Sequence, residues 1–493
     1  MTKPEENDLF ILIESLKSSN FKSYRRSLEK SNKTDSDLKL KFLKHIVGRS
    51  NENKDDFIGL NKISESKYNT LKFDVFQDII KFLKSNYEAY SDIGLQNQII
   101  EFEILLNRGL FIKANRKLKK IKKIALEKCD FNTCSVIQRK AIEHRLFTHT
   151  NPPSDLTTES ELLLNYQKLS NNLNTYSLLS DKILNLHYEF MDRRLERSKL
   201  ILDYLKNPNL QNFNQAQSVL ACYNYYRIKS LIYLGNNDYE KAKFYSLKAY
   251  NYLKENASVY RNDYMRRLIS LNNYLAASLD LEEIEPFEFM YPQMVEIAKI
   301  ASLNSDTYSS ARTFQVLSSL KLNYLWITRD ANAFAKERDY YESSFLKYKS
   351  IMRPNFKLEI MLGIAKMFFI AGELNQANAY CKKINDEKSN PTSLYISCAN
   401  LLRIMINFDL NNFQLLPHLI STSKYAIKKR NRLFDFESLF LKGISTIKPY
   451  SSQKEKKRLF ADLYRELNLI VESSEDIIVE KKLRVLSWLK EKL

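Results

Sequence analysis

The stretch YNYYRIKSLIYLGNNDYEKAKFYSLKAYNY, residues 223–252, constrains the fold more than any other part of the sequence. A first helix is predicted by residues that recur near the helical period: Tyr226, Ser230, Tyr233 and Leu234. Gly235 to Asp238 is typical of a turn, because Gly and Asn tolerate a positive φ and Asp can cap the next helix. A second helix places Ala242 and Ala249 on one face, where small side chains let two helix backbones come close. The stretch therefore predicts an antiparallel pair of helices.

Glycine and proline are scarce, and this scarcity argues against strand-rich folds. The 493 residues contain eight glycines and ten prolines, fewer than the many turns of a sandwich or barrel need. Apolar residues make up 44% of the chain, which allows extensive burial and is not typical of a disordered protein. We therefore expect an almost entirely helical protein.

This pair of helices resembles the tetratricopeptide repeat, a helix-turn-helix unit that stacks into long arrays. On the repeat pattern, Tyr226 stands at the first large position, Ser230 at the first small one and Tyr233 at the aromatic one. Ala242 and Ala249 stand at the two alanines, whereas the proline that usually follows the second helix is missing.

A second match to the pattern runs from Leu358 to Asp386. The residues at its successive positions are Met361, Ala365, Phe368, Gly372, Ala377 and Cys381, with Ile384 in place of the second alanine. The resemblance implies an all-α fold, a right-handed superhelix of tetratricopeptide-like helical hairpins (an α-solenoid). In such a fold each pair of helices buries its apolar stripe against the next pair.

Both ends of the chain resemble an uncharacterised bacterial family of long helical-repeat, tetratricopeptide-like proteins. Near the N-terminus the resemblance lies in LIESLKSSNFKSYRRSLEK, LKLKFLKHI and YNTLKFDVFQDIIKFLKS, and near the C-terminus in FDFESLFLKGISTIKPYSSQKEKKRLFADLYREL and LSWLKEKL. The family has no general assigned activity, so the resemblance implies a scaffold and no functional residues. We expect an N-terminal helical cap at residues 1–93, repeats at 94–400 and a C-terminal helical module at 401–493. Within the cap, residues 48–66 are polar and predict a loop or short turn.

Residues 113–123 contain an unusually dense cluster of positive charge. It contains seven cations in eleven residues and no acid: Lys113, Arg116, Lys117, Lys119, Lys120, Lys122 and Lys123. Its expected buried stripe is Ala114, Leu118, Ile121 and Ala125. Like charges at i,i+4 repel by about a few tenths of a kcal/mol per pair. The repulsion within this helix is therefore offset either by an acidic partner or by Glu101 and Glu103 of the preceding helix. The net charge of +19 favours acidic partners but also fits a lysine-rich solvated surface.

The expected function is a non-enzymatic binding scaffold that holds a protein or peptide partner on a helical-repeat surface. The candidate groove residues on the first helices are Arg227, Leu231, Leu362, Lys366 and Phe369. An alternative is a nucleic-acid- or ribosome-associated protein that binds RNA or DNA through its basic helices. In that case two further basic clusters, at residues 193–199 and 428–432, should merge with residues 113–123 into one stripe. A second alternative is a ligand- or peptide-responsive regulatory protein, on which the sequence is silent.

Signatures of catalysis and of metal binding are missing from the sequence. It contains no Gly-rich phosphate loop, no G-x-S-x-G elbow and no H-E-x-x-H pair. His144 and His149 follow Cys129 and Cys134 closely enough to pose a metal site, but the spacings do not match the usual zinc patterns. We therefore expect no enzyme, no cofactor and no metal.

The apolar segments and the cysteines bear on the location of the protein. No apolar run approaches the roughly 18 residues needed to span a bilayer, and the N-terminal residues are acidic and lack the basic region of a secretory signal. The five cysteines are scattered, as expected of reduced thiols. We expect a cytoplasmic protein without a transmembrane segment.

Overall fold

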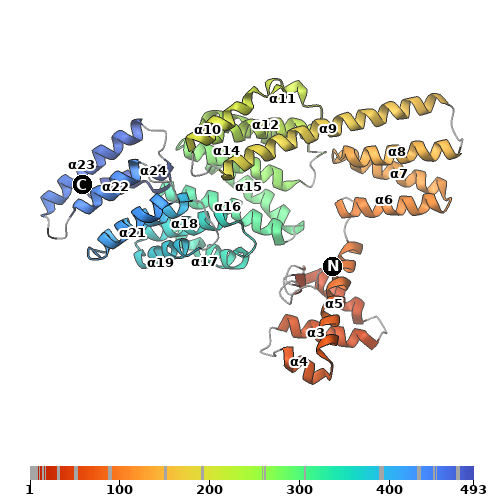
Figure 1. Ribbon diagram of the computed structural model, residues 1–493, viewed down its shortest axis with the longest axis horizontal. Helices are drawn as coiled ribbons and strands as arrows, with labels where there is room; N and C mark the ends of the chain where they lie inside the picture. Colours follow the sequence, from red (N-terminus) through yellow and green to blue (C-terminus); the bar gives the residue numbers. More distant parts are fainter. Residues whose placement is uncertain are drawn as a thin grey trace. The chain divides into compact units, whose positions relative to one another are not determined.

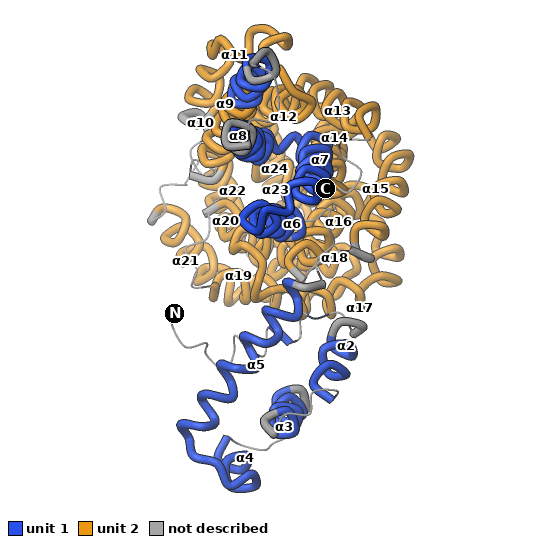
Figure 2. The backbone as a smooth tube through the Cα atoms, turned by 90° about the vertical axis from the view of Figure 1, so that its right-hand side faces the viewer, with its two compact units in different colours: residues 1–167 blue, residues 168–493 orange. Residues whose placement is uncertain are grey.

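The protein is helical throughout the part of the chain that the structure describes. The computed structural model describes residues 9, 12–13, 16, 18–29, 34–48, 54–86, 92–148, 153–189, 194–257, 259, 263–304, 307–387, 393–429, 435–447, 450, 452–473 and 478–493. The regular elements of these residues are helices, and no strand occurs among them (Figure 1). The expectation of an all-helical protein is confirmed. The chain divides between Gln167 and Lys168 into two compact units, which Figure 2 shows in different colours.

The four N-terminal helices described in unit 1 pack around a small aromatic core. They are α2 (Ser18–Glu29), α3 (Thr34–Gly48), α4 (Lys54–Asn61) and α5 (Glu65–Asn86). Phe42, Phe57 and Tyr68 meet edge to face, with ring centroids 5.3 to 5.9 Å apart, an arrangement that aromatic quadrupoles favour. Helix α4 lies within residues 48–66, where the sequence predicted a loop or short turn. It forms because burial of Phe57 against this core fixes a segment that is otherwise polar.

Three more helices complete unit 1 before α9 (Pro153–Glu189). These are α6 (Asp92–Asn107), α7 (Phe111–Glu127) and α8 (Phe131–Thr148), and each contacts the next. The turn between α6 and α7 favours a glycine, because Gly109 has a φ of 74°. The amide of Leu110 donates to the carbonyl of Leu105 at 2.9 Å and closes the end of α6.

Unit 2 contains the C-terminal part of α9 and the helices that follow it. Their bounds are α10 (Arg194–Asp203), α11 (Pro208–Gln211), α12 (Val219–Gly235), α13 (Tyr239–Glu255), α14 (Tyr264–Asp280), α15 (Glu285–Asn304), α16 (Thr307–Thr328), α17 (Ala331–Tyr348), α18 (Pro354–Ile370), α19 (Leu374–Asn385), α20 (Ser393–Asp409), α21 (Leu416–Lys429), α22 (Asp435–Thr446), α23 (Gln453–Ser473), α24 (Ile478–Leu483) and α25 (Val485–Lys490). Short 3-10 helices, η1 (Tyr204–Lys206) and η2 (Phe213–Gln215), flank α11.

Helices α12 and α13 form the antiparallel pair predicted from residues 223–252. Ala242 is fully buried, and the hydroxyls of Ser230 and Ser246 meet across the pair at 2.6 Å. The Asp238 side chain caps α13 by accepting from the Lys241 amide at 3.1 Å. In the turn, Asn237 adopts the positive φ, at 61°.

Gly235 serves packing instead of the turn. It is the last residue of α12, and a Cβ at this position would lie 2.7 Å from the Cδ1 atom of Ile201 on α10. A side chain at this position would therefore have to displace Ile201, so the close approach of α10 favours glycine.

Helices α18 and α19 form the second predicted pair. The residues at its apolar pattern positions are buried: Met361, Ala365, Phe368, Ala377, Cys381 and Ile384. Gly372 takes the positive φ in the turn, at 76°. A Cβ at Gly363 would lie 3.0 Å from the Cδ1 atom of Leu322, so α18 packs tightly on α16.

The helices of unit 2 follow a regular order of contacts. From α12 to α23 each helix touches the next, and α12, α14, α16, α18 and α20 also contact one another in succession. We call these five the first helices, because each opens a pair whose second member is α13, α15, α17, α19 or α21. A continuous core of buried side chains extends from α16 to α25. It crosses the boundary expected at residue 400, which lies within α20.

The C-terminal segment, residues 478–493, packs back against helices that lie far earlier in the chain. The Arg484 guanidinium donates to the carbonyl of Ile327 at 3.3 Å, and the Lys481 ammonium lies 3.5 Å from the carbonyl of Asp280. These carbonyls lie at the C-terminal ends of α16 and α14, where the helix dipole favours positive charge. Trp488 is buried and donates its indole N–H to Asp409 of α20 at 3.0 Å.

Candidate functional site

The two groove candidates on α12 lie against neighbouring helices. Arg227 donates to the hydroxyl of Ser180 on α9 at 2.6 Å. Leu231 is buried in a core cluster formed with residues of α9 and α10. Both side chains therefore help to hold the start of unit 2 together.

The three candidates on α18 lie in or beside the core. Leu362 and Lys366 are buried, only 2% and 4% exposed, and Phe369 is half-buried. The Lys366 ammonium lies 5.0 Å from the centre of the Trp326 ring and donates to the carbonyl of Lys482 at 3.2 Å. Within the described residues it forms no ion pair.

A polar cavity of about 230 Å³ lies beside Lys366. Its walls come from α14, α16, α18 and α20, and α24 contributes Lys482. The charged side chains that line it are Asp280, Arg312, Glu359, Lys366 and Lys482, and the amide side chains are Asn272, Gln315 and Asn323. Three of the first helices, α14, α16 and α18, thus bring charged and amide groups together at one place.

The two lysines of this cavity differ in their electrostatics. Burial lowers the pKa of Lys366 to about 7, and the positive charges of Lys482 and Arg484 act in the same direction. Burial also acts to lower the pKa of Lys482, but the Glu359 and Asp280 carboxylates outweigh it and raise that pKa above its usual value. Lys482 therefore stays charged at neutral pH, whereas Lys366 is poised to gain or lose its proton.

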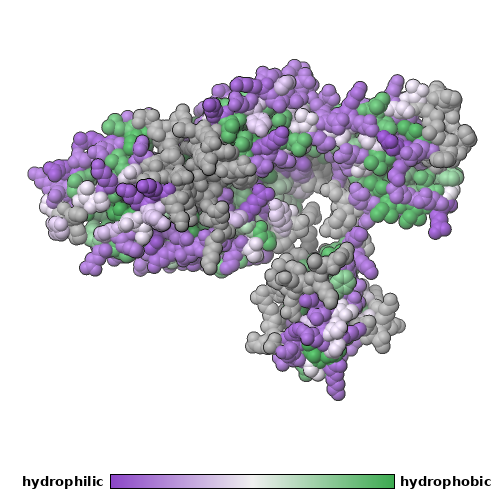
Figure 3. Space-filling view, viewed as in Figure 1, coloured by the Kyte–Doolittle hydropathy of each residue, from purple (hydrophilic) through white to green (hydrophobic). Residues whose placement is uncertain are grey.

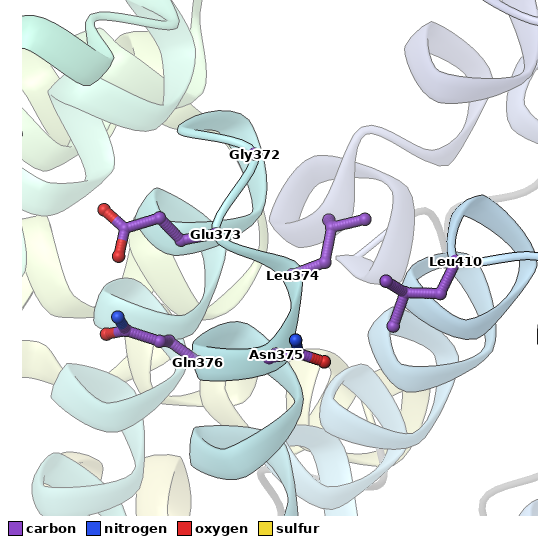
Figure 4. Close-up of a pocket in the computed structure, with 6 residues that line it drawn as sticks. All are labelled: Gly372, Glu373, Leu374, Asn375, Gln376 and Leu410. Atoms are coloured by element: carbon purple, nitrogen blue, oxygen red, sulfur yellow. The ribbon is translucent and has the colours of Figure 1, made fainter.

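A second, shallower pocket lies where α18, α19 and α20 meet (Figure 4). Leu374 and Leu410 lie on one side of it, and Glu373 and Gln376 on the other. The Arg338 guanidinium already binds both polar groups, at 3.1 Å from Glu373 Oε2 and 2.6 Å from Gln376 Oε1. These groups stabilise the contact between α17 and α19, so Glu373 and Gln376 are already engaged and offer little to a ligand in the pocket.

The basic residues of α7 separate into two groups. Lys117 forms an ion pair with Glu101 of α6, and Lys122 donates to Gln138 Oε1 at 2.9 Å. The other five are exposed and form no ion pair with any described residue: Lys113, Arg116, Lys119, Lys120 and Lys123. Glu103 instead pairs with Lys140 of α8 at 2.7 Å. Of these two α6 carboxylates, Glu101 alone therefore pairs with a cation of α7. In the clusters at residues 193–199 and 428–432, the side chains of Lys199 and Lys428 are described, and those of the other basic residues lie outside the described part of the chain.

Apolar side chains are exposed on the same part of unit 1. Figure 3 shows hydrophobic residues gathered over α6–α8. Those with large exposed side chains are Ile100, Ile104, Leu110, Phe111, Ile112, Leu126 and Val136. The buried stripe of α7 consists of Ala114, Ile121, Ile124 and Ala125, while Leu118 is half-buried. Exposed cations and exposed apolar groups thus occur together on these three helices.

The thiols behave as core side chains. All five cysteines are buried, and none forms a disulfide. Burial and the nearby Asp130 carboxylate raise the pKa of Cys134 to about 12, and burial raises the pKa of Cys381 to about 12. Such thiols stay protonated at neutral pH and are poor nucleophiles and metal ligands. The side chains of His144 and His149 lie outside the described residues.

Sequence reasoning named Leu362 and Lys366 of this cavity but missed the charged residues that surround them. Arg312, Glu359 and Lys482 lie on three elements that are far apart in the chain. Arg312 and Glu359 are isolated charges on largely apolar helices, and Lys482 belongs to a run of surface-like charge, so no local motif marks them. The packing of α16 on α18 brings Arg312 and Glu359 together, and the return of α24 adds Lys482.

Comparisons with known proteins leave the family open. No protein-family model matches the chain, and no curated protein matches its sequence. Along the described helices, none is both long enough and apolar enough to cross a bilayer. Fold and site therefore define a class only: an all-helical protein in which five helices of unit 2 line a polar cavity.

Proposed function

We propose that this protein is a non-enzymatic cytoplasmic scaffold that holds a protein or peptide partner on the inner surface of a right-handed, tetratricopeptide-like superhelix. We also propose that the protein is related to the bacterial helical-repeat family that both chain ends resemble. The observation that supports it most is the packing order in unit 2, where α12, α14, α16, α18 and α20 contact one another in succession. Successive first helices of this kind build the binding surface of helical-repeat proteins.

An intramolecular contact supports the same proposal. The first helices already hold a short peptide segment, α24, through the bond from Lys366 to the Lys482 carbonyl. Arg484 adds an ion pair with Glu282 at 3.0 Å, just beyond the end of α14. A surface that binds one helical turn by carbonyl, charge and apolar contacts has the chemistry needed to bind a partner's helix.

Affinity purification from the native cell tests the proposal. The bait is the full-length protein, treated with nuclease, and it is compared with a variant that adds Ser319→Arg and Asn323→Arg to the inner face of α16. The matched control adds two arginines to the exposed face of α17, by Asn332→Arg and Ala335→Arg. A protein partner should survive nuclease and the control changes and be lost from the inner-face variant. Retention by the inner-face variant would contradict the proposal.

A nucleic-acid- or ribosome-associated role is the second candidate, and the five exposed cations of α7 favour it. Positive charge spaced along about 15 Å of helix, at 1.5 Å per residue, is suited to contact several phosphates. In the same purification this role predicts partners that nuclease releases and that both arginine variants retain.

A further inference from the structure

One face of α7 combines exposed cations with exposed apolar side chains at both of its ends. Ile112 begins this face and Leu126 ends it, and both are exposed. At 100° per residue, its side chains fall within an arc of about 140°, opposite the buried Ile121 and Ala125. We call it the basic face of α7, after the five exposed cations that lie between the two apolar ends: Lys113, Arg116, Lys119, Lys120 and Lys123.

The apolar group is largest at the N-terminal end of the basic face. Leu110 and Phe111 directly precede Ile112, and all three are exposed, Ile112 by 73%. The one acid in the sequence of α7 is Glu127, its last residue, so the helix itself does little to neutralise the charge beside this group. Unneutralised cations and aliphatic groups in water lie together here, as at surfaces that bind a partner.

We propose that the basic face of α7 docks on an anionic phospholipid surface. The cations would lie at the level of the lipid phosphates, and Leu110, Ile112 and Leu126 would enter the apolar edge of the bilayer. Apolar burial and attraction to anionic lipid add in surface binding of this kind, and each Lys or Arg near such a surface strengthens binding by about fivefold. The proposal goes beyond the scaffold function and does not depend on it.

The distribution of charge on this face favours lipid over a protein. Its cations lie in the middle and its apolar side chains at the ends, whereas the centre of a protein interface is depleted of charged residues and its rim is polar. Nucleic acid would account for the cations, which contact phosphates. It would leave Leu110, Ile112 and Leu126 without a role, because bases stack on aromatic side chains. A bilayer surface offers phosphates to the cations and hydrocarbon to the aliphatic groups.

Vesicle co-sedimentation of the full-length protein tests the proposal. The vesicles consist of phosphatidylcholine alone or of an equal mixture of phosphatidylcholine and phosphatidylserine, and mixed-sequence RNA is titrated in parallel. A charge variant removes three cations of the basic face by Lys119→Gln, Lys120→Gln and Lys123→Gln. An apolar variant removes aliphatic surface by Leu110→Gln and Ile112→Gln.

Matched controls make the same changes at exposed positions of unit 2. The charge control combines Lys336→Gln, Lys349→Gln and Lys382→Gln. The apolar control combines Leu178→Gln and Leu346→Gln. Because all the changed residues are exposed, the variants should keep the melting temperature of wild type, which is measured alongside.

A second measurement tests whether the apolar end enters the bilayer. Ile112→Trp places an indole at the proposed contact, and Leu346→Trp places one at an exposed position of α17. Brominated phospholipids in the anionic vesicles quench an indole that lies within the bilayer. The native Trp326 and Trp488 are buried, so wild type gives the background.

We expect wild type and both controls to bind the anionic vesicles, and to bind phosphatidylcholine alone only weakly. Binding should weaken as salt is added, because salt screens the attraction. The charge variant should bind about a hundredfold more weakly and the apolar variant about tenfold more weakly. Brominated lipid should quench Ile112→Trp and leave Leu346→Trp unchanged.

Three results would contradict the proposal. Absence of wild-type binding to the anionic vesicles, or undiminished binding of the charge variant, would overturn it. Undiminished binding of the apolar variant, with no quenching of Ile112→Trp, would show that the apolar end does not enter the bilayer. RNA binding that is tighter than vesicle binding, and that the charge variant alone loses, would assign the basic face to nucleic acid.

Discussion

At the scale of single residues, Lys366 is a side chain whose burial destabilises the fold. It is 4% exposed, and a buried ammonium without a carboxylate partner is destabilising. Its pKa falls from 10.5 in the unfolded chain to about 7 in the folded protein. Between these two values the unfolded chain binds the proton that the folded protein has released. Stability therefore rises with pH across this window, and the full cost is present below pH 7.

Replacing this lysine should stabilise the protein. Lys366→Met keeps an unbranched apolar side chain, so it removes the charge with little change in packing. We expect a higher melting temperature at about pH 6, by a free energy on the order of a few kcal/mol, and a smaller gain at about pH 9. Thermal unfolding at both pH values, with Lys382→Met as the control, checks this. A melting temperature lowered at pH 6 would show that the charge is paired in the folded protein.

Ala242 tests the packing of the best-defined helix pair. Its Cβ is fully buried between α12 and neighbouring helices, so a larger side chain must push the helices apart. Ala242→Phe should cost at least the roughly 1–3 kcal/mol typical of overpacking, measured by denaturant unfolding. Ala335→Phe makes the same change at an exposed position of α17 and should be nearly neutral. Equal stability of the two variants would contradict the close contact.

At the scale of elements, α7 separates the two candidate functions. Lys119, Lys120 and Lys123 are exposed and form no ion pair with described residues, whereas Lys117 is tied to Glu101. If α7 binds nucleic acid, changing these three to Glu should weaken binding to RNA of any sequence and flatten its salt dependence.

A titration with mixed-sequence RNA at two salt concentrations measures this effect of α7. The control reverses three exposed lysines of unit 2: Lys336, Lys349 and Lys382. Under the scaffold proposal, wild-type binding is weak and vanishes near physiological salt. Binding that resists salt and that the α7 variant alone abolishes would favour the nucleic-acid role.

Three elements show which features could be predicted from the sequence alone and which could not. Periodicity and turn residues predicted the pair α12–α13, because its contacts are local and its cap at Asp238 follows a short-range rule. The role of Gly235 could not be predicted in the same way, since it depends on Ile201 of α10. Helix α4 was missed because one buried residue, Phe57, stabilises a segment of polar composition.

At the scale of the whole molecule, contacts between residues far apart in the chain form the cavity, and local sequence patterns cannot predict such contacts. The cavity around Lys366 needs Lys482, which is more than a hundred residues away. The inner face of α18 could be named from the repeat pattern, but that pattern does not show what lies against it. The sequence therefore predicted an all-helical protein and two residues that line the cavity, Leu362 and Lys366, and long-range packing determined the rest.

The C-terminal segment should make unit 2 unfold more cooperatively than an array of independent pairs. In an array with nearest-neighbour contacts alone, a change at one end loosens only the adjacent pairs. Here Arg484 binds the end of α16 and Lys481 contacts the end of α14, so the segment connects the last helices to the middle ones. Loosening the segment should therefore loosen those middle helices as well.

Trp488 is the anchor of this segment and gives the test. It is 2% exposed and packs against Phe408, Phe440 and Phe460, with ring centroids 5.9 to 6.2 Å apart. Trp488→Ala should cost about 3–5 kcal/mol and should speed hydrogen exchange in α14 and α16 as well as in α22 and α23. Tyr450→Ala removes an aromatic side chain that is 85% exposed and should change neither. If exchange in the Trp488 variant accelerates only in α20–α25, the contacts at α14 and α16 do not couple the two ends of unit 2.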